Sequence, residues 1–122
     1  IESQILNRDG FNCSFCGIPV ISQVIRKIIH NMFPTAVPWG KRNADQHAAF
    51  QAMWLQFDHV LPHSRGGATA LNNMVITCAP CNYGRMERTT GELGILNPLS
   101  RQRSKSNWDG LERLIIGKQQ RL

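Results

Sequence analysis

The chain has 122 residues, of which 42% are hydrophobic, and it carries a formal net charge of +6. This length suits a single domain with a modest hydrophobic core, and no apolar run is long enough to span a bilayer. The positive charge favours an anionic partner, most commonly nucleic acid, although excess charge can also serve solubility alone. Residues 85–122 hold eight Lys and Arg against four Asp and Glu, so most of the excess lies there.

The first elements are predicted to be helices. Residues 1–12 are expected to form a short helix that breaks at Gly10. Residues 19–33 give the clearest helical pattern, with Pro19 at a position that suits a helix start. The apolar positions of this helix are Val20, Ile21, Val24, Ile25, Ile28, Ile29 and Met32. Arg26 is predicted to lie on the opposite, solvated flank.

Residues 35–43 are predicted to form a loop in which Trp39 has two interpretations. Together with Lys41 and Arg42, this indole could stack on and grip a nucleic-acid strand. It could equally anchor the loop by packing against the core. A short helix is expected to follow over residues 44–53.

Two strands and a helix are predicted next. Residues 54–60 place aromatic and branched side chains at alternating positions, which indicates a strand. In that strand Asp58 and His59 would point to opposite faces of the pleat. Residues 74–77 would form a second strand, antiparallel to the first across a long loop. Residues 80–93 are predicted to continue as one helix.

The end of the chain is predicted to combine a basic arm with a final helix. The segment over residues 97–106 has no acidic residue, and it is either a solvated linker or a strip that follows phosphates. The alternating basic residues favour the strip: Arg101, Arg103 and Lys105. Ser106 and Asp109 resemble a capping box that opens a helix with Trp108 on its apolar face.

The four cysteines form two Cys-x-x-Cys pairs. An even count also suits disulfides, but the chain shows no secretory signal pattern. We therefore interpret the pairs as one closed zinc site in a reducing compartment, which predicts a cytoplasmic protein. A thioredoxin-like redox pair is an alternative for the first two cysteines, although no strand-helix pattern frames them. The predicted zinc ligands are Cys13, Cys16, Cys78 and Cys81.

Three motifs occur together in this chain. They are Cys-x-x-Cys-Gly at residues 13–17, Asp-His-Val-x-Pro-x-Ser-x-Gly-Gly at residues 58–67, and Asn-x-x-x-x-Cys-x-x-Cys-Asn at residues 73–82. The combination resembles the HNH endonuclease family. That resemblance implies a small α+β domain with a ββα-metal fold, often with a structural zinc. It also implies cleavage of DNA with one divalent cation, leaving a 5′-phosphate.

The resemblance further implies roles for single residues. His59 matches the general base, and Asp58 and Asn82 match the ligands of the catalytic cation. Oxygen donors favour Mg²⁺ or Mn²⁺ at such a site. Asn82 replaces the third histidine of the family name, a substitution compatible with activity. Asn73 matches the asparagine that braces the loop and helps to hold the imidazole, and Arg85 matches a basic residue that faces phosphate. The predicted DNA contacts are thus Arg85, Arg101, Arg103 and Lys105.

We predict a single HNH nuclease domain over residues 1–122, as part of a longer protein because the chain starts at Ile1. It would carry a helical insertion over residues 17–57, and a basic arm with a C-terminal helix over residues 97–122. DNA is the expected partner, and both a homodimer and fusion to a targeting domain are open. Two alternatives are a zinc-stabilised module that binds DNA without cutting it, and a protein–protein module that uses the two apolar helices.

Overall fold

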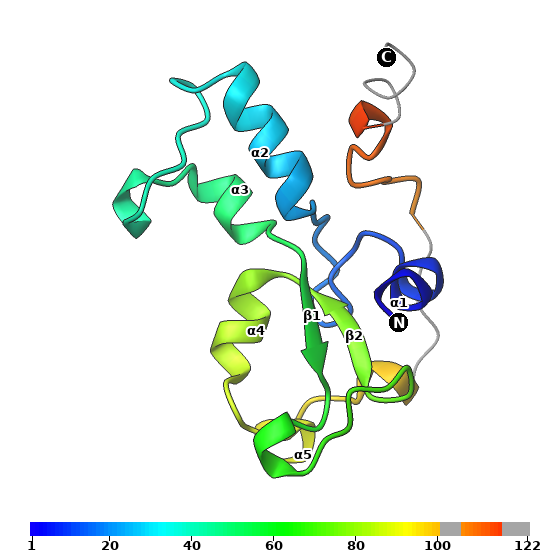
Figure 1. Ribbon diagram of the computed structural model, residues 1–122. Coiled ribbons are helices and arrows are strands. Elements are labelled where there is room, and N and C mark those ends of the chain that lie inside the picture. Colours follow the sequence, from blue (N-terminus) through cyan, green and yellow to red (C-terminus); the bar gives the residue numbers. More distant parts are fainter. Residues whose placement is uncertain (101–105, 116–122) are drawn as a thin grey trace.

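The computed structural model describes residues 1–100 and 106–115, and a small antiparallel sheet lies at its centre (Figure 1). Strand β1 (Gln56–His59) pairs with β2 (Met74–Thr77), with Phe57 opposite Ile76 and Asp58 opposite Val75. Helix α1 (Glu2–Asp9) packs against β2, and α4 (Ala79–Arg85) packs against β1. This arrangement confirms the predicted small α+β domain.

The core of this part lies between the sheet and α1. Met74 and Ile76 of β2 pack with the fully buried Ile5 of α1, and Phe57 of β1 lies against them. These side chains share one face of the sheet because alternate residues of a strand point to the same side. Gln56 and Asp58 consequently project from the other face, toward α4.

Helix α2 (Gln23–Met32) is shorter than the 19–33 helix predicted from the sequence. Ser22 caps its N-terminus by accepting a hydrogen bond from the Ile25 N–H group at 3.3 Å. The preceding residues are extended because they form isolated bridges, which pair Pro19 with Asn12 and Ile21 with Trp54. The buried row is narrower than predicted, since Val24 and Met32 are 58% and 55% exposed. Its buried residues are Ile21, Ile25 and Ile29.

The prediction that Arg26 is solvated is wrong, because this side chain is only 2% exposed. Its guanidinium lies 4.6 Å from the ring centroid of Trp39 and 5.8 Å from that of Trp54, within cation–π range. Its Nη2 group also donates to Gln46 Oε1 at 2.5 Å. The segment after α2, which contains Trp39 and Gln46, folds back over the side of the helix that was predicted to be solvated. Trp39 is therefore a loop anchor in this structure.

Two predicted helices are divided in the structure. The 44–53 helix becomes a 3₁₀ turn, η1 (Asn43–Asp45), and the short α3 (Ala48–Ala52), capped by His47. The 80–93 helix becomes α4 and α5 (Thr90–Leu93), because Met86 adopts a positive φ of 51° between them. Thr89 then starts α5 with a capping box. Two further 3₁₀ turns are η2 (His63–Arg65) and η3 (Pro98–Ser100).

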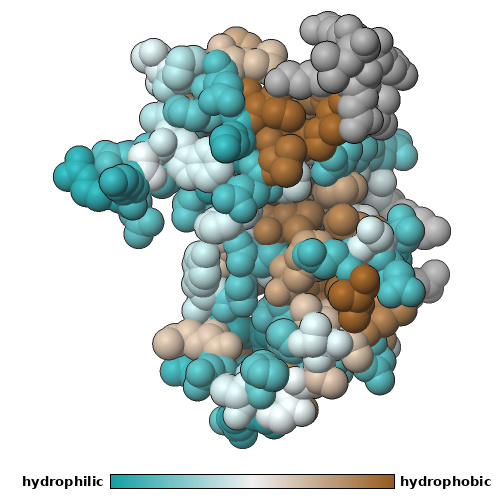
Figure 2. Space-filling view, in the orientation of Figure 1, coloured by the Kyte–Doolittle hydropathy of each residue, from teal (hydrophilic) through white to brown (hydrophobic). Residues whose placement is uncertain are grey.

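Residues 108–115 pack against α2, and Figure 2 shows apolar residues gathered on this part of the surface. Trp108 packs there and donates its Nε1–H to the Val20 carbonyl at 2.8 Å. The predicted capping box is absent, since Ser106 Oγ donates to Asn12 and Asp109 accepts from the Leu111 N–H group. No helix among the described residues is long and apolar enough to cross a membrane. The predicted strip of Arg101, Arg103 and Lys105 lies outside the described residues.

Candidate active site and structural metal centre

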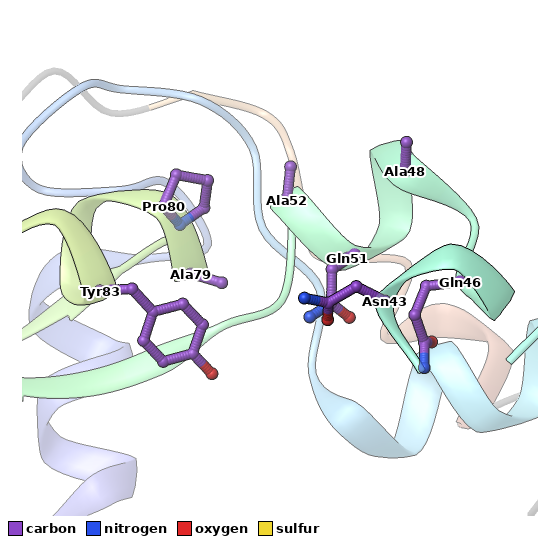
Figure 3. Close-up of a pocket in the computed structure, with 8 residues that line it drawn as sticks. All are labelled: Asn43, Gln46, Ala48, Gln51, Ala52, Ala79, Pro80 and Tyr83. Carbon is purple, nitrogen blue, oxygen red and sulfur yellow. The ribbon is translucent and has the colours of Figure 1, made fainter. Parts of the chain in front are cut away.

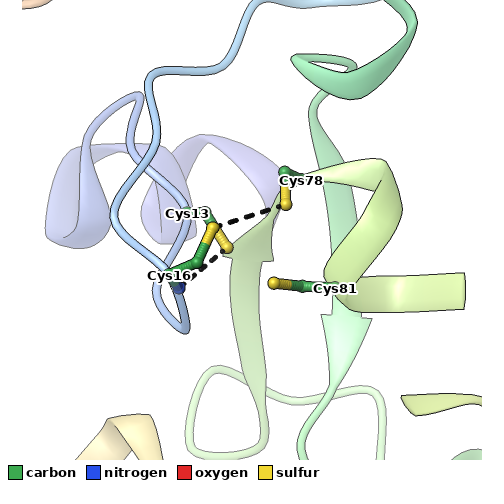
Figure 4. A group of neighbouring side chains, drawn as sticks. All are labelled: Cys13, Cys16, Cys78 and Cys81. Carbon is green, nitrogen blue, oxygen red and sulfur yellow. Dashed lines mark hydrogen bonds between the residues drawn. The ribbon is translucent and has the colours of Figure 1, made fainter. Parts of the chain in front are cut away.

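The four cysteines come together from two segments of the chain, the turn over residues 13–16 and the start of α4 (Figure 4). Their sulfur atoms all lie within 4.8 Å of one another, and the Sγ atoms of Cys16 and Cys78 are 3.7 Å apart. Four sulfurs bound tetrahedrally to zinc at about 2.3 Å would be separated by about 3.8 Å. All four are free cysteines and no disulfide joins them. The cluster therefore fits a structural metal such as zinc.

The backbone around the first pair explains how two distant segments meet. Gly17 adopts a left-handed φ of 84° and donates its N–H to the Cys13 carbonyl, which closes a tight turn. The Ser14 N–H group donates to the Ile76 carbonyl at 2.8 Å and fastens this turn to β2. Cys78 directly follows β2 and occupies the N-cap position of α4, whose first turn carries Cys81. A metal here would join the N-terminal segment to the start of α4.

The surroundings of the thiols affect how readily they ionise. Burial raises the pKa of Cys78 to about 11 and also raises the pKa of Cys81. Burial opposes ionisation of Cys13 as well, but backbone hydrogen bonds outweigh it and lower the pKa of that thiol. Metals bind the thiolate form, so loading of this cluster would release protons.

A second group of side chains lies between β1 and α4. Gln56 and Asp58 point from the strand toward the helix, where Asn82 and Arg85 lie about one turn apart. The Nδ2–H group of Asn82 donates to Gln56 Oε1 at 3.2 Å. Arg85 Nη2 donates to Asp58 Oδ2 at 2.6 Å. These two contacts bring the predicted cation ligands Asp58 and Asn82 to one interface.

The expectation that Arg85 faces phosphate is wrong for this structure, because the residue is 5% exposed. Besides Asp58, its guanidinium bonds the backbone carbonyls of His59 at 2.8 Å and Val60 at 3.2 Å. It also lies 4.8 Å from the ring centroid of Phe15. The side chain lies against the end of β1, and the Arg88 carbonyl accepts a further hydrogen bond from it at 3.2 Å. Burial raises the pKa of Asp58, and the Arg85 guanidinium acts against that rise.

His59 points away from this interface toward the loop that joins the strands. Its Nε2 atom lies 2.8 Å from Thr69 Oγ1, at hydrogen-bond distance, and its ring centroid is 5.7 Å from that of His63. The opposite orientations of Asp58 and His59 agree with strand alternation. Sequence analysis did not identify Thr69, because no motif or periodicity marks this loop residue.

Asn73 holds the same loop in place with its side chain. Its Oδ1 atom accepts from the Leu61 N–H group at 2.9 Å, and its Nδ2 group donates to the carbonyls of Leu61 and Ala68. The turn depends on Gly67, where a Cβ atom would lie 1.7 Å from the Leu61 carbonyl oxygen. This is the bracing geometry that the resemblance implies, and the part of Asn73 in catalysis stays a prediction.

Two antiparallel strands and a helix, with an Asp-His pair on one strand and a four-cysteine cluster beside them, have the layout of a ββα-metal domain. Residues 47–94 match the family model described as HNH endonuclease. This stretch of the chain is therefore similar to the HNH endonuclease family. The match includes β1, β2, α4 and α5, and it leaves the first cysteine pair outside. No curated protein and no solved structure matches the chain.

Cys78→Ser should release the structural metal and lower the melting temperature sharply. The reason is that metal binding to such a site contributes directly to folding, with apparent values of about 10–16 kcal/mol in zinc-finger peptides. Metal analysis of purified protein and thermal unfolding would measure both effects, and chelation of the wild type should reproduce the loss. Purified wild type without zinc, or a variant that melts like wild type, would contradict the assignment.

Arg85→Ala should destabilise the domain by about 3–5 kcal/mol, because it leaves the Asp58 carboxylate buried without its partner. Urea unfolding would measure this loss. Arg88→Ala is the matched control, since that arginine is exposed one turn later and should cost little. Unchanged stability of Arg85→Ala, with the salt slope of DNA binding reduced by about one unit, would instead support the phosphate contact.

Proposed function

We propose that this domain hydrolyses phosphodiester bonds in DNA, with His59 as general base and a divalent cation bound by Asp58 and Asn82. The observation that carries the proposal is the packing of α4 on β1. Asn82 bonds Gln56 and Arg85 bonds Asp58 across one interface, at 3.2 and 2.6 Å. The match of residues 47–94 to the HNH endonuclease model and the net charge of +6 support DNA as the substrate.

The hydrogen bond between His59 and Thr69 supports a specific role for each nitrogen of the ring. If Nε2–H donates to the Thr69 hydroxyl, the lone pair of Nδ1 is left to accept a proton from water. Thr69 then fixes the tautomer and orientation of the imidazole. Asn73 contributes indirectly, because it holds the loop that carries Thr69 against the end of β1.

The partners of Asp58 and Asn82 leave one oxygen of each available. Arg85 engages Oδ2 of Asp58, so Oδ1 is the atom for a cation. The amide nitrogen of Asn82 donates to Gln56, which turns its Oδ1 atom outward from that bond. Arg85 and Gln56 thus orient the two ligands. Oxygen donors suit Mg²⁺ or Mn²⁺, which would stabilise negative charge on the departing 3′-oxygen.

A second candidate function is DNA binding without cleavage. The observation in its favour is the buried Asp58–Arg85 ion pair, which gives Asp58 a structural role that needs no cation. Nicking of a supercoiled plasmid with and without Mg²⁺ separates the two functions.

His59→Ala should reduce plasmid nicking by about a hundredfold to ten-thousandfold while DNA affinity changes little. A neutral imidazole contributes little to phosphate binding, but its loss removes the proton acceptor. His63→Ala is the control, since this exposed ring is close to His59 but has no assigned role. Near wild-type nicking by His59→Ala would remove His59 from the mechanism.

Replacing Asn82 should change which metal supports cleavage. Asn82→His adds a nitrogen donor and should shift the preference from Mg²⁺ toward nickel, cobalt or zinc, whereas Asn82→Ala should lose most activity. Cleavage by wild type and both variants across magnesium, manganese, cobalt, nickel and zinc, with the structural metal retained, tests this. An identical metal ranking for wild type and Asn82→His, with Asn82→Ala fully active, would exclude Asn82 as a ligand.

A further inference from the structure

A hollow of about 410 Å³ lies between α3 and α4, and we call it the α3–α4 hollow (Figure 3). Small apolar side chains of both helices line one part of it, among them Ala52 and Ala79. The ring of Tyr83 stands on the α4 side and faces across the hollow toward the carboxamides of the insertion. Those carboxamides are Asn43, Gln46 and Gln51.

The three carboxamides differ in their hydrogen bonds to the rest of the protein. Gln46 is fixed, because its Oε1 atom accepts from the buried Arg26 at 2.5 Å and its Nε2 group donates to the Gly40 carbonyl. Within the described residues, the side chains of Asn43 and Gln51 have no hydrogen-bond partner. Each of these two amides can therefore offer one acceptor and two donor hydrogens to a ligand.

We infer that the α3–α4 hollow binds one unpaired nucleobase of the DNA strand on which the proposed active site acts. An exposed aromatic ring stacks on the face of any base, and carboxamides bond base edges, with Asn and Gln pairing well with adenine. Small side chains such as Ala52 leave room for a flat ring between these groups. A paired base inside a duplex is stacked on both faces, so only an unpaired or extruded base could enter. This inference rests on the proposed function.

The position of Tyr83 connects the α3–α4 hollow to the chemistry. Tyr83 directly follows Asn82, the proposed cation ligand, and neighbouring helical residues are turned about 100° from each other. Asn82 therefore faces β1 while Tyr83 faces the insertion. Successive bases of a DNA strand are only about 3.4 Å apart along a helix axis. The bound base should thus belong to a nucleotide close to the cleaved bond.

Binding of a labelled single-stranded oligonucleotide to the zinc-loaded protein, without Mg²⁺ so that nothing is cut, tests this inference. Tyr83→Ala should weaken binding by about 5-fold to 150-fold, the range expected for loss of one stacked base. Tyr83→Phe keeps the stacking ring and should bind like wild type. Phe33→Ala is the matched control, because Phe33 is 53% exposed against 55% for Tyr83 but lies outside the hollow.

A scan with single abasic nucleotides identifies the base that is bound. At one position near the cleaved bond, loss of the base should weaken wild-type binding as Tyr83→Ala does, and the two losses should not add. At that position Asn43→Ala and Gln51→Ala should reduce the preference among the four bases. The exposed Asn31→Ala on α2 should leave this preference unchanged.

The possible failures can be told apart. A wild type that neither cuts DNA nor binds the oligonucleotide would overturn the proposed function and this inference with it. Cleavage by a wild type whose oligonucleotide affinity is unaffected by Tyr83→Ala, or abasic losses that add fully to that variant, would overturn only the base site. Binding of a free nucleoside monophosphate as tightly as the oligonucleotide would make the hollow a mononucleotide site and also overturn the inference.

Discussion

The ion pair between Arg85 and Asp58 is the contact on which the arrangement of the site depends. Two charges at 2.6 Å in a buried position must be compensated by further hydrogen bonds, since desolvation alone would outweigh their attraction. The carbonyls of His59 and Val60 provide that compensation. The Arg85 guanidinium therefore donates to Asp58, His59 and Val60 at the end of β1. These bonds fix the position and the rotation of α4 relative to the strand. The position of Asn82 on that helix follows from this constraint.

Helix α4 could not hold this position by its own propensity. It has only seven residues, which include Pro80 and Gly84, and a helix so short is unstable in isolation. A metal bound by the cysteine cluster would hold its first turn against the N-terminal segment, and Arg85 holds its last turn against β1. Asn82 lies between the two attachments. A short element held at both ends gives a ligand the positional accuracy that a catalytic cation requires.

The sequence was informative where the signal is local. Strand alternation predicted β1 and the opposite orientations of Asp58 and His59, and the spacing of the cysteine pairs predicted their convergence. The burial of Arg26 and Arg85 could not be predicted, because helical periodicity places Arg26 on the polar flank and the family resemblance places Arg85 toward phosphate. Each is buried by partners from other elements, such as Trp39 for Arg26. The role of Thr69 depends in the same way on how the loop after β1 folds back.

The segment over residues 39–54 bears on how a substrate would be held. Arg26 is enclosed by the rings of Trp39 and Trp54, a desolvated cation–π arrangement that can contribute about 2 kcal/mol. The same guanidinium also donates to Gln46, and this bond fixes the segment around Gln46 that faces α4. Helix α4 is thus shared by two surfaces, with Asn82 turned to the strand and Tyr83 to the insertion. Because α4 is fixed on both sides, the distance between these two surfaces is fixed as well. A base bound beside Tyr83 would therefore determine which phosphate lies beside Asn82.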